Sequence, residues 1–205
     1  KEDKLISLAE YKEAMKSTDE DILYAVGDSL ERIKNSPVLS QIDEDRDVLL
    51  LDEKLDEFLI KMLKDYKDLP FKSINQVEEN ENADEDESDK KLVDFAKENT
   101  PDDVVDVRFT DKMGDIPSMI KQRGEVSIEM EKTLKNQPQA MGIKADKVLE
   151  INKETRAYKL LIENLDKDKD KAKIIIGLLL DQARLMEGLE IEDPVSYTKN
   201  IWKLI

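Results

Sequence analysis

Short apolar runs alternate with helical patterns over the first 76 residues. Strands are predicted where the runs are short and bounded by charged or turn residues, at 21–26 (DILYAV), 47–51 (DVLLL) and 71–74. Helices are predicted at about 7–15, 29–35 and 52–66. Ser7-Leu8-Ala9-Glu10 is a capping box that opens the first helix, and Leu55, Leu59, Met62 and Tyr66 share one face of the third. This alternation favours a small parallel α/β unit.

An acidic stretch follows at 78–89 (EENENADEDESD), in which Ala83 is the single apolar residue. A segment of this composition cannot bury enough apolar surface to fold by itself. Residues 77–89 are therefore predicted to be a flexible connector between two domains. A docking strip for a basic partner is the alternative interpretation.

The pattern after the connector predicts a mixed α+β domain at 90–205. Strands are expected at 104–109, 117–121 and 147–151, and helices at 90–97, 125–135, 154–164, 169–186 and 194–205. Asp193 before Pro194 is a good helix start, because Asp caps well and Pro fits the first helical position.

The helix at 169–186 contains the block IIIGLLL and is apolar nearly all round. Such a helix must be covered on every side, which a domain of about a hundred residues seldom achieves alone. The last two helices therefore form either an internal hairpin or one half of a pair of hairpins packed across a two-fold axis. The preceding Asp-Lys repeat at 166–171 resembles the start of a calcium loop, but Lys171 and Gly177 stand where that loop requires Gly and Glu.

Composition excludes several kinds of active site. The 205 residues include no His and no Cys, which rules out Ser-His-Asp and Cys-His catalysis and ordinary zinc sites. The six glycines form no phosphate-binding motif, so no catalytic residue, metal or cofactor is expected. The lack of Cys and of a signal-like apolar run indicates a cytoplasmic location.

The net charge of −16 is unevenly distributed. Residues 1–100 contain 15 basic and 29 acidic side chains, a net charge of −14, whereas residues 101–205 contain 18 and 20, a net charge of −2. The acidic half should repel nucleic acid and anionic membranes, so neither is expected as a partner. The nearly neutral half can approach a copy of itself without much repulsion.

Several segments resemble, in order, the heat shock protein 90 chaperone family in its bacterial form. The segments are SLAEY (7–11), LYAVGDSLERIKNSP (23–37), VLLLDEKLDEFLIKMLKDYKDLPFKSI (48–74), KADKVLEIN (144–152) and LLLDQARLMEGLEIEDP (178–194). The resemblance implies that 1–76 is the last α/β subdomain of the family's middle segment and 90–205 its C-terminal dimerisation domain. The ATP-binding domain, with its ATP and magnesium, would then lie outside this chain, which would not itself be an enzyme.

The resemblance also implies two sets of functional residues. Contact with unfolded client proteins is expected at Phe58, Val126, Met130 and Leu134. A homodimer interface in the last two helices is expected from Ile175, Leu178, Leu179, Leu185, Met186, Tyr197, Ile201 and Trp202. The predicted function is therefore the dimerisation and client-contact part of an ATP-dependent chaperone. An acidic homodimeric scaffold without chaperone activity is the alternative, and a carboxylate-based hydrolase is a weaker third hypothesis because no pair of acids has a recognisable spacing.

Overall fold

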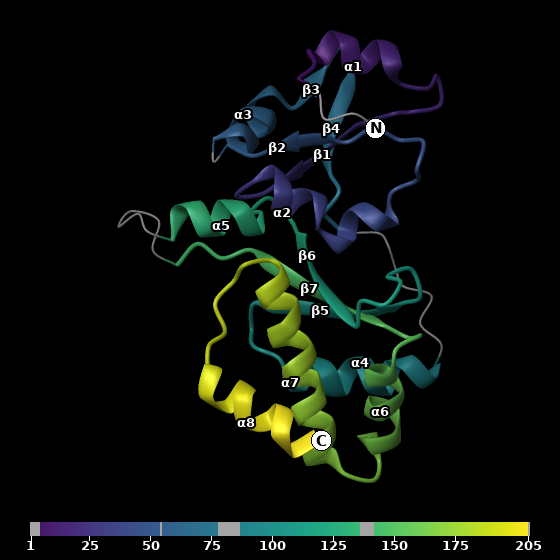
Figure 1. The fold of residues 1–205 in the computed structure, drawn as a ribbon, viewed down its shortest axis with the longest axis vertical. Helices are drawn as coiled ribbons and strands as arrows, with labels where there is room; N and C mark the ends of the chain where they lie inside the picture. Colours follow the sequence, from purple (N-terminus) through teal and green to yellow (C-terminus); the bar gives the residue numbers. More distant parts are fainter. Residues whose placement is uncertain (1–4, 54, 78–86, 136–141, 205) are drawn as a thin grey trace. The chain divides into compact units, whose positions relative to one another are not determined.

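The computed structural model describes residues 5–53, 55–77, 87–135 and 142–204, without the side chains of 87–89. The chain divides into two compact units, Lys1–Gln76 and Val77–Ile205, and each is described by itself (Figure 1). Most of the predicted connector at 77–89 lies outside the described residues. Val77 is an exception, because it is buried and its amide donates a hydrogen bond to the Gln122 carbonyl at 2.8 Å.

The first unit is built on a four-stranded sheet in the order β2-β1-β4-β3. Its elements are α1 (Leu8–Ala14), β1 (Ile22–Val26), α2 (Leu30–Lys34), η1 (Pro37–Gln41), β2 (Leu49–Leu51), α3 (Asp56–Leu63), β3 (Asp65–Tyr66) and β4 (Leu69–Ser73). The central strand β1 runs parallel to β2 and β4, and its residues from Ile22 to Ala25 are buried, as expected for an inner strand of a parallel sheet. The predicted α/β unit is confirmed.

Local contacts explain how the elements of this unit begin and meet. The predicted capping box is present, since the Ser7 side chain accepts from the Glu10 amide and the Glu10 carboxylate accepts from the Ser7 amide. Gly27 lets β1 and α2 approach closely, because a Cβ at this position would lie 2.9 Å from Cγ1 of Ile33. The Tyr11 hydroxyl donates to the Asp47 carbonyl at 2.6 Å and so joins α1 to the segment before β2.

The predicted helix at 52–66 is wrong at both ends. α3 begins at Asp56 and ends at Leu63, because Lys64 takes a positive φ of 64° that does not continue a helix. Tyr66 instead pairs with Leu69 in the β3–β4 hairpin, a tertiary contact that helical periodicity does not register. The remaining residues of the proposed stripe, Leu55, Leu59 and Met62, are exposed.

The second unit packs helices against one face of a three-stranded sheet in the order β5-β7-β6. Its elements are α4 (Glu87–Glu98), β5 (Val104–Thr110), β6 (Ser118–Arg123), α5 (Ile128–Leu134), β7 (Asp146–Asn152), α6 (Arg156–Leu165), α7 (Lys169–Met186) and α8 (Pro194–Leu204). β7 is parallel to β5 and antiparallel to β6. The helices α4, α6 and α7 lie on the same side of the sheet (Figure 1) and share one apolar core with it. The predicted mixed α+β domain is confirmed.

The apolar helix α7 is largely covered inside its own unit, by β6 and α6 with α8 alongside. Its backbone is tied to the sheet where the Ser118 hydroxyl donates to the Leu179 carbonyl at 2.7 Å. The Asp-Lys repeat before it starts the helix, since the Asp168 carboxylate accepts from the Lys171 amide at 3.0 Å. Of the helices described, none has the length and apolarity needed to cross a membrane.

The β3–β4 hairpin contains a strained turn that generates a testable prediction. Lys67 and Asp68 form the two-residue loop between the paired Tyr66 and Leu69, with φ angles of 51° and 67°. Loops of this kind favour Gly at the second position, because L side chains are strained at positive φ. Asp68→Gly should therefore stabilise the first unit by about 0.5–1 kcal/mol, measured by urea unfolding followed by circular dichroism.

The matched control is Asp43→Gly, which makes the same charge change at an exposed residue whose φ is not positive. This control should destabilise the unit, because glycine there only adds unfolded-state entropy. Equal destabilisation by both variants would contradict the strained-turn argument.

Candidate functional site

Helix α5 is held in place by contacts at its first turn. It has seven residues, whereas an isolated helix needs about 12–15 residues to be stable in water. The Ser127 side chain caps it by accepting from the Met130 amide at 3.0 Å. The Ile128 amide donates to Oε1 of the buried Gln122 in β6 at 3.0 Å, and the Ile128 side chain is itself buried. The position of α5 is therefore set by tertiary contacts.

A second attachment of α5 runs through a buried lysine. Lys147 in β7 is 1% exposed, and its ammonium group lies 2.7 Å from Oε2 of Glu131 in α5 and 3.0 Å from Oδ2 of Asp103. It also donates to the Ala145 carbonyl at 3.1 Å. All three donors of the ammonium group thus have acceptors, two of them charged, which is what permits burial of a lysine.

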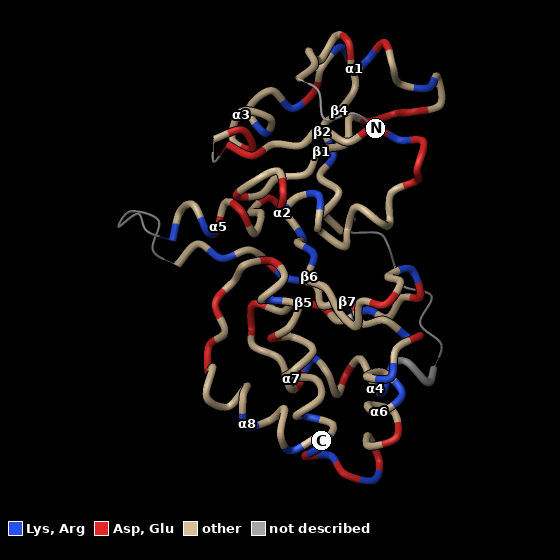
Figure 2. The backbone as a smooth tube through the Cα atoms, in the orientation of Figure 1, with Lys and Arg blue, Asp and Glu red and all other residues tan. Residues whose placement is uncertain are grey.

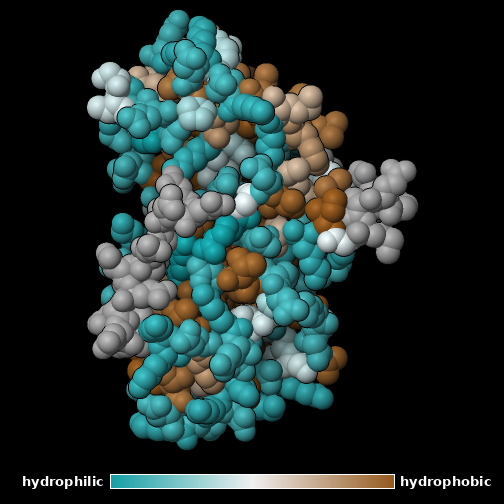
Figure 3. Space-filling view, turned by 180° about the vertical axis from the view of Figure 1, so that it is seen from behind, coloured by the Kyte–Doolittle hydropathy of each residue, from teal (hydrophilic) through white to brown (hydrophobic). Residues whose placement is uncertain are grey.

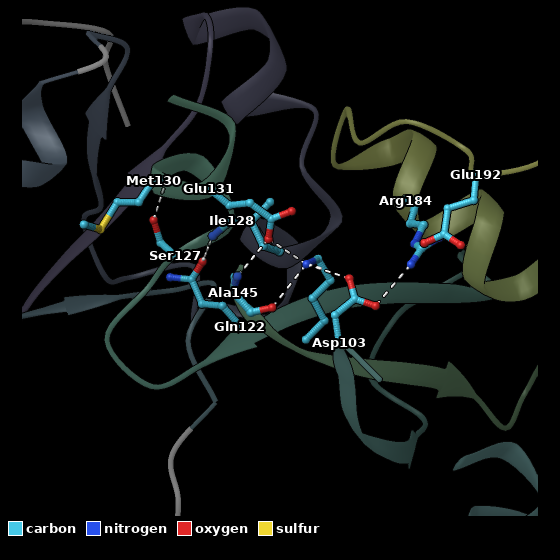
Figure 4. A network of polar contacts seen from close by, with 10 residues as sticks. Asp103, Gln122, Ser127, Ile128, Met130, Glu131, Ala145, Arg184 and Glu192 are labelled. Carbon is cyan, nitrogen blue, oxygen red and sulfur yellow. Dashed lines mark hydrogen bonds and ion pairs between the residues drawn. The ribbon is translucent and has the colours of Figure 1, made fainter. Parts of the chain in front are cut away.

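The contacts of Asp103 extend this arrangement to α7. Its other carboxylate oxygen lies 3.3 Å from Nη2 of Arg184, which is buried in α7, and Nη1 of Arg184 lies 3.2 Å from Oε1 of Glu192 in the loop before α8. Glu131, Lys147, Asp103, Arg184 and Glu192 form a chain of alternating charges, called the charge network below (Figure 4).

The pKa of Asp103 reflects its place in this network. Burial alone would raise the pKa of the carboxyl group, but the hydrogen bond and charge of Lys147, with the charge of Arg184, hold the pKa below its ordinary value. Asp103 therefore stays ionised and keeps both neighbouring cations paired.

A second ion cluster surrounds Asp106 in β5. Its carboxylate lies 2.7 Å from Nζ of Lys97 in α4, 2.6 Å from Nη2 of Arg123 in β6 and 3.3 Å from Nε of Arg108. Burial would raise the pKa of Asp106, but these three cations lower it to about 2. This cluster attaches α4 to the sheet.

Helix α8 presents an apolar surface that its own chain does not bury. None of its described residues is buried, and Trp202 is 73% exposed. Val195 on α8 and Leu185 and Met186 at the end of α7 are also exposed. Lys199 and Lys203 are the only charged residues of α8, which is drawn mostly in tan in Figure 2. Elsewhere, the face seen in Figure 3 is largely hydrophilic, with separate apolar areas.

The predicted interface residues fall into two groups. Leu185, Met186 and Trp202 are exposed, and Tyr197 and Ile201 are half-buried. Ile175, Leu178 and Leu179 are buried within the single chain, where Ile175 and Leu179 belong to the core of the second unit. These three have little surface left to offer a second copy, because the sheet and α6 already cover that face of α7, and their place in an interface stays a prediction.

The predicted client-contact residues are divided between the units. Phe58 is half-buried in α3 of the first unit. Met130 and Leu134 are half-buried on α5, but Val126 precedes Ser127, the cap of that helix, and packs against the core. The predicted helix at 125–135 therefore started too early, and its stripe is reduced to Met130 and Leu134.

Sequence reasoning missed the charge network. The available signal was Lys147 in the strand DKVLEIN, where every residue after Asp146 is buried. Its partners Glu131 and Asp103 lie 16 and 44 positions away along the chain. Arg184, which pairs with Asp103, lies 37 positions away from Lys147. No local pattern connects them. Among the described residues, no group of three or more carboxylates is arranged to hold a metal ion.

Comparison with known proteins gives a consistent family. The chain matches the family described as Hsp90 protein over residues 1–205. It is 41% identical over 211 residues to the Chaperone protein HtpG of Clostridium perfringens, 41% over 214 residues to that of Clostridium botulinum and 40% over 213 residues to that of Natranaerobius thermophilus. Each comparison covers 100% of this chain and 34% of the relative. The chain thus spans about a third of the length of these relatives.

These matches correct two predictions. The matches cover residues 1–205 of this chain and about one third of each relative. They do not support the prediction that the chain is a C-terminal fragment, and that prediction is withdrawn. The prediction that the chain is not an enzyme rested on that placement, and because the whole chain matches HtpG chaperones it is withdrawn as well. The described residues contain no glycine-rich loop leading into a helix to hold phosphate, so no step of ATP chemistry is derived from them.

The Asp106 cluster predicts a pH dependence of stability. The pKa of this carboxyl group is about 2 in the folded protein against an ordinary value of 3.8, so its contribution is complete above about pH 4 and is lost as the pH falls towards 2. Asp106→Asn should remove about 1–2 kcal/mol of stability at pH 6 and almost none at pH 2, measured by urea unfolding at each pH. Asp102→Asn, at an exposed neighbouring carboxyl, should keep the wild-type profile, and a parallel offset at every pH for Asp106→Asn would contradict the assignment.

Proposed function

The chain belongs to the Hsp90 family. We propose that it contributes to the function of a molecular chaperone by self-association through α8 and the end of α7. The observation that carries this proposal is that α8 has eleven residues and buries none of them in its own chain. Its own chain covers α8 only in part, since Leu204 packs against the core and Tyr197 and Ile201 are half-buried. A helix this short is marginal in water without further apolar packing. A second copy of the same surface, related by a two-fold axis, supplies that packing without any other partner.

The energetics favour association through this surface. Leu185, Met186, Val195 and Trp202 are 48%, 37%, 63% and 73% exposed in each copy, so covering the exposed part contributes about half of the roughly 1.5–3 kcal/mol that full burial of such a side chain gives. Two copies supply eight such side chains against an association cost of about 4–15 kcal/mol. Charge does not oppose contact, because residues 101–205 have a net charge of −2.

A second role, contact with unfolded client chains, is supported by α5. Met130 and Leu134 are large apolar residues that stay half-exposed on a short helix whose other contacts hold it on the sheet. Met suits variable partners, since its side chain is unbranched and polarizable. Phe58 in the first unit is kept as a client-contact residue by the family resemblance. The relatives are named chaperones, which favours this role over that of a scaffold without chaperone activity.

Leu185→Glu tests self-association. A carboxylate placed in an apolar interface loses hydration without gaining a partner, so the dimer dissociation constant should rise about 100-fold, equivalent to about 2.7 kcal/mol. Sedimentation equilibrium provides the measurement. Ile162→Glu is the matched control on α6, because Ile162 and Leu185 are each 48% exposed, and it should leave the dimer unchanged. A wild-type chain that remains monomeric at tens of micromolar (about 6 kcal/mol of association at most) contradicts the proposal.

Met130→Ser tests client contact. The chain should slow the aggregation of a heat-denatured test enzyme, and the variant should need about fivefold more protein for the same effect, since it loses about 1 kcal/mol of apolar contact. Val105→Ser, at an exposed apolar residue of β5, should behave as wild type, and both variants should remain dimers. Absence of any effect of the wild-type chain on aggregation would instead favour the scaffold.

A further inference from the structure

Helix α5 and the loop between α7 and α8 are separate in sequence but are attached to the same buried groups. Lys147 contacts Glu131 on α5, Arg184 contacts Glu192 in the loop, and Asp103 lies between the two cations. The side chains of Lys147, Arg184 and Asp103 are 1%, 5% and 11% exposed, so solvent screens their interactions little. The network thus ends on α5 at one side and on the α7–α8 loop at the other.

We infer that the charge network couples the stability of α5 to that of the α7–α8 loop, with Asp103 as the positioning residue that joins them. Asp103 belongs to neither helix and sits in the segment before β5. Its two oxygens take one cation each, Oδ2 facing Lys147 and Oδ1 facing Arg184. Loss of Glu131 leaves Asp103 as the only charged partner of Lys147 among the described residues, which draws Asp103 towards Lys147 and weakens its contact with Arg184.

The same contacts oppose local opening at both ends. In α5, Oε2 of Glu131 accepts from the Ala145 amide at 2.8 Å as well as from Lys147, so opening of α5 leaves two donors without this acceptor. In the loop, the Leu189 amide donates at 2.8 Å to the carbonyl of Arg184, the residue whose guanidinium contacts Asp103 and Glu192. Local openings that share a buried group couple energetically without a large structural change.

A surface ion pair provides a competing route between the same two elements. Lys135 at the end of α5 lies 2.6 Å from Glu190 in the loop, with side chains 59% and 84% exposed. Pairs this exposed contribute little, because solvent screens them and two long side chains must be ordered. The coupling therefore runs through the buried network and not through this pair.

If the two surfaces act as proposed above, a client chain on α5 would alter self-association through α8. That consequence rests on the proposed function. The coupling itself does not, and it is tested on the chain held monomeric by dilution.

The experiment is native-state amide hydrogen exchange in the full chain. Glu131→Gln should speed exchange of the Leu189 amide about fivefold or more, the lower range of typical coupling between sites. Glu192→Gln should speed exchange of the Lys135 amide, which donates to the Glu131 carbonyl at 2.8 Å, by about twofold or more, because coupling acts in both directions. This effect should be smaller than that of Glu131→Gln, because solvent partly screens the pair of Glu192 with Arg184. Glu192 is 67% exposed, so this second variant folds even if the first is strongly destabilised.

Three controls separate coupling from general destabilisation. Glu129→Gln changes a carboxylate of the same helix with a similar exposed fraction, 18% against 17% for Glu131, and its ion-pair partner Lys132 lies within α5. It should leave Leu189 unchanged. Lys135→Gln, which breaks the surface pair, should also leave Leu189 unchanged. In an Asp103→Asn background, Glu131→Gln should no longer affect Leu189.

Each opposite result overturns the inference. The two ends of the network would be independent if Glu131→Gln changed exchange of the Leu189 amide less than twofold and Glu192→Gln changed exchange of the Lys135 amide less than twofold. A full effect from Lys135→Gln would move the coupling to the surface pair. Persistence of the effect in the Asp103→Asn background, or equal acceleration at the Asn152 amide of β7, would show that Asp103 does not transmit it.

Discussion

The buried ammonium group of Lys147 is the constraint on which the second unit depends. A charge at this depth is tolerated only if every donor is satisfied, and here Glu131, Asp103 and the Ala145 carbonyl supply the three acceptors. Each acceptor belongs to a different stretch of the chain, so satisfying one lysine also places α5 and the segment before β5 relative to β7. Removing one partner of such a buried pair costs about 3–5 kcal/mol, which far exceeds the intrinsic stability of a seven-residue helix. The position of α5 is therefore a consequence of the charge, and not of helix propensity.

Apolar surface is distributed very differently from charge in this unit. The face of α7 towards the sheet is buried with β6 and α6, whereas the end of α7 and much of α8 stay exposed. The chain spans about a third of the length of its HtpG relatives, and Val195 and Trp202 on α8 lie exposed close to the exposed Leu185 and Met186 in sequence. The self-association that we propose would cover these side chains with the surface that is already present.

The two surfaces to which we assign function differ in how they are supported. The α5 surface is held by the buried Ile128 together with ion pairs and hydrogen bonds, so a change in charge can adjust it. The α8 surface is carried on α7, whose inner side chains are part of the core. A common attachment through Asp103 and Arg184 gives the fold a physical route by which one can respond to the other.

Local patterns determined most elements of this protein. The run at 169–186 specified a helix of the observed length, because its apolar periodicity, the Asp168 cap and the absence of Pro agree. The strands around Val104, Ser118 and Lys147 were predictable from short apolar runs. Tertiary structure decided which apolar face was covered: Ile175 and Leu179 entered the core, whereas Trp202 did not. It also ended α3 at Leu63, since strand pairing of Tyr66 outweighed helical spacing, and it brought Glu131, Asp103 and Arg184 to one lysine. Periodicity records which side of an element is apolar, but coverage and charge pairing depend on segments far apart in the chain, and only folding brings those together.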